Sequence, residues 1–143
     1  MQSMEISRSA LDVEWRRLEV IAQNLANANT VRTAAGEPYR AQRLVSGPRA
    51  DFGALLQGAP AAAGQLQGVQ VYGLEPIDLP GRRVHEPGNP QADADGYVTY
   101  PGFDHAAEMT LMVKTARAYE ANLVAMSTAR QMYLKALEVG KRP

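Results

Sequence analysis

The chain has 143 residues, with 15 basic and 15 acidic side chains and no cysteine. This balanced charge argues against a nucleic-acid-binding protein, because phosphate contacts require a basic excess. The lack of cysteine excludes disulfides and thiolate zinc sites, and the length suits one domain.

The amino-terminal segment is predicted to be helical from Met4 to Ala28, because it contains neither glycine nor proline. The start, Met1–Glu5, has no basic leader followed by an apolar run, so we expect no cleaved secretion signal. No run of about 18 apolar residues suggests a membrane span. Apolar residues recur every three or four positions, as in a helix that packs against another helix: Leu11, Trp15, Leu18, Ala22 and Leu25.

Three asparagines, Asn24, Asn27 and Asn29, cluster at the end of this helix. Asparagine is a poor helix former that tolerates the left-handed conformation, which favours a carboxy-terminal cap. A cap explains one or two amides but not three. Hydrogen bonds to a neighbouring subunit are therefore a second interpretation, and both stay open.

The middle of the chain, residues 31–103, carries most of the glycine and proline and predicts short strands and turns rather than helix. One helical turn is predicted at Phe52–Leu56. Strands are predicted where β-branched and aromatic residues gather: Tyr39–Val45, Val69–Tyr72, Arg82–His85 and Tyr97–Tyr100.

No catalytic, metal or cofactor site is predicted. The Asp93–Gly96 segment resembles part of a calcium loop, but its glycine comes fourth instead of sixth, so a structural turn is favoured. His85 and His105 show no ligand spacing, and no serine lies in a nucleophile motif. We therefore expect a protein that is not an enzyme.

The carboxy-terminal segment is predicted to be helical from an Asp104 cap to Val139. One apolar stripe is interrupted only by Arg130, and a second stripe of smaller residues includes Leu111 and Ala118. One face can pair with the amino-terminal helix, and the other needs a further partner. The first stripe comprises Met109, Met112, Ala116, Tyr119, Leu123, Met126, Tyr133 and Leu137.

The expected fold is mainly α with a small β-rich insertion. Residues 1–30 and 104–143 form long helices paired as a coiled coil, and together they make one core domain around the β-rich middle, residues 31–103.

Three motifs resemble the bacterial flagellar rod and hook axial protein family, and within it the proximal rod type. They are Asn24–Thr30, the Glu86–Pro90 turn with Ala92–Val98, and Arg117–Asn122. The resemblance implies a structural subunit of the periplasmic rod of the basal body, exported by the type III apparatus without a cleaved signal. It implies a hollow shaft that transmits torque and lets axial proteins pass. Implied partners are copies of itself, proximal and distal rod subunits, a rod-base adaptor and the export apparatus.

The terminal helices are then expected to supply the helix and subunit interface, without direct membrane insertion. A soluble helical adaptor or secretion chaperone is the alternative function. The predicted interface residues are Leu11, Trp15, Leu18, Asn24, Leu25 and Asn27 on the first helix, and Met112, Tyr119, Asn122, Leu123, Met126 and Tyr133 on the second.

Overall fold

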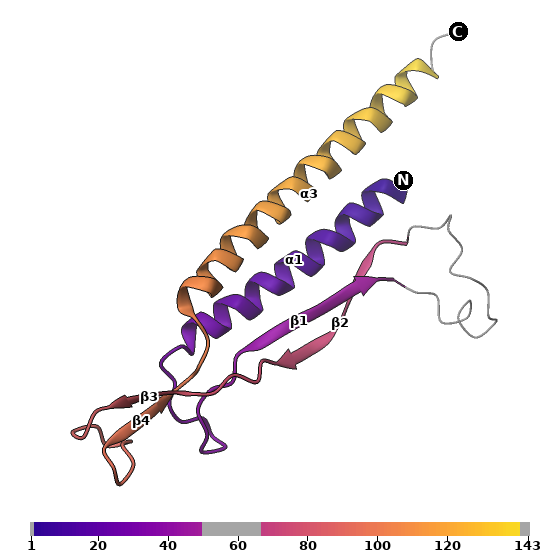
Figure 1. Ribbon diagram of the computed structural model, residues 1–143. Helices are drawn as coiled ribbons and strands as arrows, with labels where there is room; N and C mark the ends of the chain where they lie inside the picture. The colour runs from indigo at the N-terminus through magenta and orange to yellow at the C-terminus, as the bar shows by residue number, and fades with distance from the viewer. Residues whose placement is uncertain (1, 50–66, 141–143) are drawn as a thin grey trace, which may run out of the picture. The chain divides into compact units, whose positions relative to one another are not determined.

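A computed structural model describes residues 2–49 and 67–140. In those residues one long helix precedes and another follows four strands in the order of the chain (Figure 1). The strands form two separate two-stranded sheets, β1 with β2 and β3 with β4. This confirms the predicted fold class, while the turn predicted at residues 52–56 lies outside the described residues. The elements are α1 (Gln2–Ala26), β1 (Gln42–Pro48), β2 (Val69–Pro76), β3 (Arg82–His85), β4 (Tyr97–Tyr100) and α3 (His105–Val139).

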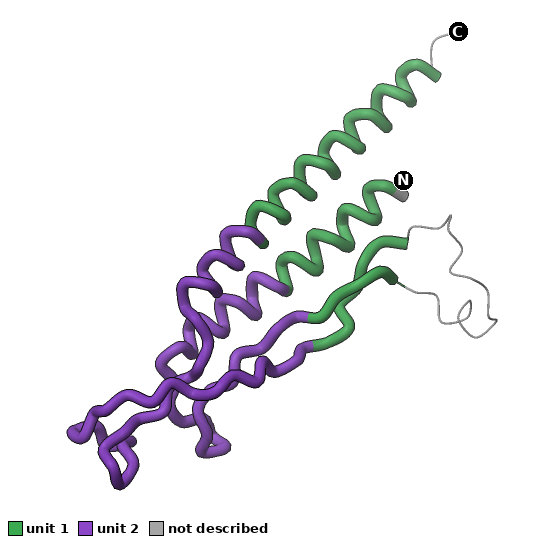
Figure 2. Tube along the Cα trace, in the orientation of Figure 1, with its two compact units in different colours: residues 1–16, 45–73, 115–143 green, residues 17–44, 74–114 purple. Residues whose placement is uncertain are grey.

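The chain divides into two compact units, each of which takes a part of both helices (Figure 2). Unit 1 contains residues 1–16, 45–73 and 115–143, and unit 2 contains residues 17–44 and 74–114. The division predicted from the sequence, 1–30, 31–103 and 104–143, remains a prediction.

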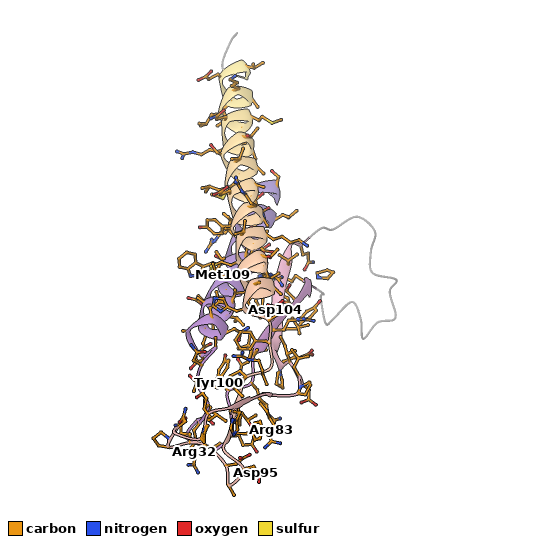
Figure 3. All side chains as sticks on the ribbon, turned by 60° about the vertical axis from the view of Figure 1, so that its left-hand side comes forward. Arg32, Arg83, Asp95, Tyr100, Asp104 and Met109 are labelled. Carbon is orange, nitrogen blue, oxygen red and sulfur yellow. The ribbon has the colours of Figure 1, made fainter. Side chains whose placement is uncertain are left out.

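The predicted bounds of β3, β4 and α3 match the structure closely. β1 starts three residues later than expected, and β2 ends four residues later. Tyr39 does not join a strand because its N–H donates to the carbonyl of Thr30 (3.0 Å). The Asp104 cap is confirmed, since its Oδ1 accepts a hydrogen bond from the N–H of Ala106 (2.9 Å). Figure 3 labels Asp104 at the base of α3 and Met109 about one turn above it.

In unit 1, the start of α1 and the later part of α3 run antiparallel. Trp15 contacts Tyr119 with ring centroids 6.2 Å apart, while Met4, earlier in α1, shares a groove with Ala129, later in α3. Ser9 fastens α1 to β2, because its Oγ accepts a hydrogen bond from the N–H of Val69 (3.0 Å).

In unit 2, the core lies where the end of α1 meets the strands. Val20, Ile21, Ala41 and Leu44 are buried, and Val98 of β4 is fully buried. The antiparallel β3–β4 register places Val84 opposite Val98. This small apolar cluster holds the strands that precede α3.

Gly102, just before α3, has no space for a side chain. A Cβ at this position would overlap the carbonyl oxygen of Pro80, which is backbone and cannot rotate away. We expect Gly102→Ala to lower the free energy of unfolding by about 1–3 kcal/mol, because overpacking displaces the backbone. Urea denaturation measures this, with Gly88→Ala as the control, since a Cβ there meets nothing within 4 Å. Equal effects of the two substitutions would contradict the prediction.

Candidate subunit interface

Asn24 lies in a buried polar network within unit 2, where it is only 1% exposed. Its Nδ2 donates to the carbonyl of Gln42 (2.9 Å) and to Oε2 of Glu108 (3.2 Å). Its Oδ1 accepts from the N–H of Gln42 (2.9 Å) and from the hydroxyl of Tyr39 (3.0 Å). An amide has two donor hydrogens and two acceptor lone pairs, so Asn24 uses its full capacity. The network joins α1, the start of β1, the segment before β1 and α3.

The network also contains two titratable groups. Glu108 is buried, with 8% of its surface exposed, and its carboxylate accepts from Asn24. Burial raises the pKa of the Tyr39 hydroxyl, and the nearby charge of Glu108 raises it further. Tyr39 therefore remains a neutral hydrogen-bond donor to Asn24 at physiological pH.

Asn27 and Asn122 make local contacts instead. Asn27 Nδ2 donates to the carbonyl of Gln23 (2.9 Å), and its Oδ1 accepts from Thr30 (3.1 Å), which closes the end of α1. Asn122 Nδ2 donates to the carbonyl of Ala118 on its own helix (3.0 Å). Asn27 therefore caps the end of α1 through its side chain, although none of the described asparagines adopts the left-handed conformation. The Asn24 amide is occupied by partners of its own chain.

Helix α1 buries a second apolar stripe that the sequence reasoning missed. Val13 and Val20, seven residues apart, are 5% and 4% exposed, and Ile21 is also buried. On the predicted stripe, only Leu11 is buried to a similar degree, at 9%. Ile6, Val13 and Val20 recur at intervals of seven and would have revealed this stripe.

The predicted stripe of α1 is therefore largely left on the surface. Trp15 is 56% exposed although its ring contacts Tyr119. Leu18 and Leu25 are half-buried, and Ala22 is exposed. A large aromatic side chain so exposed on a helix is an available contact for another chain.

The predicted interface residues of α3 differ in burial. Met112, Tyr119 and Met126 are half-buried, whereas Leu123 and Tyr133 are 47% and 41% exposed. Exposure along the first stripe therefore differs from residue to residue, and it increases towards the end of α3.

Helix α3 has 35 residues and α1 has 25, so α3 is ten residues, or about 15 Å, longer. Side chains project on all sides from the last turns of α3 (Figure 3). Many of them are large and apolar yet exposed: Val124, Met132, Leu134, Leu137 and Val139. Helices that are apolar on several faces are typically buried against other elements.

An open groove of about 680 Å³ lies between the two helices in unit 1. Ser3 and Met4 line one side, and α3 lines the other. The α3 side is mostly small or apolar, which permits close approach of another helix: Ala125, Thr128, Ala129, Met132, Tyr133 and Ala136.

The motif between β3 and β4 forms a self-contained turn. Asp93 Oδ1 accepts from the N–H groups of Tyr97 (2.8 Å) and Asp95 (3.1 Å), and its Oδ2 pairs with Arg83 (2.6 Å). The Tyr97 hydrogen bond is the main cause of the lowered pKa of Asp93. This confirms the structural turn predicted at this position.

The side chain of Glu86 stabilises the other end of the same motif. Its carboxylate accepts from the hydroxyl of Tyr100 (3.1 Å) and from Nδ2 of Asn89 (2.9 Å). Burial raises the pKa of Tyr100, and the bond to Glu86 acts in the same direction. These contacts are internal to the hairpin of unit 2, and Figure 3 labels Arg83 and Tyr100 within it.

Comparison with known proteins agrees with the geometry of two long helices and a small strand-rich middle. Residues 4–32 match the family model for the flagella basal body rod protein. Residues 94–139 match the model for the carboxy-terminal part of the flagellar basal body rod FlgEFG protein. No helix among the described residues has the length and hydrophobicity to cross a membrane.

Curated relatives match over almost the whole chain. The flagellar basal-body rod protein FlgC of Escherichia coli O157:H7 is 40% identical over 137 residues, which cover 96% of this chain and 95% of that protein. FlgC of Salmonella typhimurium is 39% identical with the same coverage, and FlgC of Bacillus subtilis is 36% identical over 97% of both chains. The likeness therefore includes the terminal helices and the middle region alike.

Proposed function

Since the chain belongs to the flagellar basal-body rod protein FlgC family, we propose that it builds the proximal rod through the exposed apolar surfaces of α1 and α3. The family membership confirms the resemblance, and with it a structural, non-enzymatic role in the rod of the basal body. Association with other rod components follows from the same membership. The further points below belong to the proposal.

The proposed assembly places the exposed members of the predicted interface between helices of neighbouring subunits, whereas Leu11 and Asn24 are buried within the chain. Trp15, Leu123 and Tyr133 are the most available of them, because each is more than 40% exposed. Neighbours in this proposal are copies of the chain, proximal and distal rod subunits and the rod-base adaptor. Packed helices then surround a hollow shaft that transmits torque and passes axial proteins.

The observation that carries the proposal is the apolar end of α3. Met132 is 66% exposed, Leu134 49% and Leu137 46%. Helix α3 is also ten residues longer than α1. Covering such side chains is favourable by about 25 cal/mol per Å² of apolar surface. These side chains stay in contact with water in the single chain, and packing against helices of neighbouring subunits would bury them.

Export of the chain by the flagellar type III apparatus is part of the same proposal. A rod subunit must reach the periplasm, which this export route provides without cleavage.

The alternative, a soluble adaptor or secretion chaperone, would use the helices for one partner and remain outside the rod. The exposed α3 end suits an adaptor less well, because its apolar side chains point in several directions and one partner covers one face. Recovery of the chain in purified basal bodies supports the rod subunit, and recovery only in the soluble fraction supports the adaptor.

Leu134→Asp tests the role of the α3 end. In a flagellated bacterium that carries this gene in place of its own, we expect at least about a tenfold loss of the chain from basal bodies, because a carboxylate cannot be buried between helices. The fold should persist, since Leu134 is 49% exposed. Immunoblotting of purified basal bodies and a motility assay give the readouts.

The control is Lys135→Asp, which introduces a carboxylate at the adjacent exposed position without removing an apolar side chain, and which changes the net charge by two instead of one. It should retain near-normal incorporation. Equal incorporation of both variants would show that the α3 end is not an interface.

A further inference from the structure

The apolar stripes of the two helices do not by themselves define how far one helix is shifted along the other. On α3 the first stripe repeats every seven residues from Met109 to Leu137. A repeat that is mostly apolar allows similar packing after a shift of three, four or seven residues. Some other contact must select one alignment.

The Asn24–Glu108 hydrogen bond supplies such a contact. It joins the two helices at one point of unit 2, and both side chains are buried there. A single buried asparagine is known to specify register between paired helices, because other alignments leave its polar atoms without partners. The Asn24 amide is also fixed from the other side by Gln42.

We propose that the Asn24–Glu108 pair is a register lock, which fixes the axial alignment of α3 on α1. The residues that replace Glu108 after a shift show why it is selective. A shift of three or four residues further along α3 places Leu111 or Met112 opposite Asn24, and neither has an oxygen that accepts a hydrogen bond. A shift of seven places Thr115 there, whose hydroxyl is two atoms closer to its backbone than the Glu108 carboxylate. A shift in the opposite direction is limited, because α3 begins at His105.

The proposed role of the Asn24–Glu108 pair differs from general stabilisation of the fold. Val20, one turn earlier on α1, is buried and apolar, so it favours packing in any alignment. Asn24 favours one alignment because its hydrogen bonds are directional. Loss of the lock should therefore change the number of alignments, whereas loss of Val20 should change only stability.

Distance measurements between spin labels test the proposal. The chain has no cysteine, so Ala26→Cys and Lys114→Cys introduce two unique labelling sites at exposed positions of unit 2. The labelled full-length chain should show one distance. Adding Asn24→Leu or Glu108→Leu should produce a second population in at least about a tenth of the molecules, shifted along the axis by about 5 Å per helical turn.

Two controls separate register from stability. Glu108→Gln keeps an acceptor for Asn24 and should keep one distance. Val20→Ala weakens the core without removing a hydrogen bond and should also keep one distance. A single unchanged distance in both leucine variants, or no defined distance in the parent chain, would overturn the proposal.

Discussion

Replacing Asn24 with aspartate is expected to lower the free energy of unfolding by on the order of 3 kcal/mol or more. The two side chains have nearly the same shape, but aspartate has no N–H to donate. Its carboxylate would face the Gln42 carbonyl and the Glu108 carboxylate, which now accept hydrogen bonds from Asn24 at 2.9 and 3.2 Å. An additional buried charge without a cation is among the most destabilising single changes. Chemical denaturation followed by circular dichroism measures the loss.

Asn29→Asp is the matched control, because it makes the same substitution at an exposed position five residues further on. Its effect should stay within about 0.5 kcal/mol. If both substitutions cost the same, the buried network would not be the source of the Asn24 effect.

The helices and the β3–β4 hairpin could be predicted from local signals. Glycine and proline are excluded from both helices, and Asp104 provides a cap that needs only its next two residues. β3 and β4 are short and bounded by turn residues, so their limits are also local. β1 begins three residues later than its composition predicts, because Tyr39 is a typical strand residue that here forms hydrogen bonds with Thr30 and Asn24.

The inner face of α1 could not be assigned from periodicity alone. Leu11, Trp15 and Leu18 follow a seven-residue spacing, and so do Ile6, Val13 and Val20. Two such stripes on one helix leave the buried one undetermined until its neighbours are placed. The larger side chains favoured the first stripe, whereas the structure buries the second more deeply.

The Asn24 network was beyond prediction for a related reason. Its partners lie 15, 18 and 84 residues away, at Tyr39, Gln42 and Glu108. No local motif indicates that an asparagine near a helix end meets a glutamate in another helix. Asn24 and Glu108 meet only because α3 runs back along α1 in the folded chain. Local sequence patterns therefore predict only a helix cap or a subunit contact for Asn24.

Leu123→Asp is expected to prevent incorporation into the rod while leaving the isolated chain folded. Leu123 lies on the predicted interface stripe, but it is 47% exposed, so an aspartate remains hydrated in the free chain. In an assembled rod the same carboxylate would be enclosed by apolar helices, where burial without a partner costs several kcal/mol. We therefore expect loss of motility and at least about a hundredfold less chain in basal bodies, with an unchanged thermal unfolding midpoint.

Ala121→Asp separates the stripe from the helix as a whole. Ala121 is exposed and lies two residues before Leu123, on a different face of α3. Its replacement by aspartate adds the same charge. If the stripe containing Leu123 is the interface, Ala121→Asp should retain most of the incorporation. Equal loss in both variants would mean that neighbours enclose this part of α3 on all sides, and normal motility with Leu123→Asp would remove Leu123 from the interface.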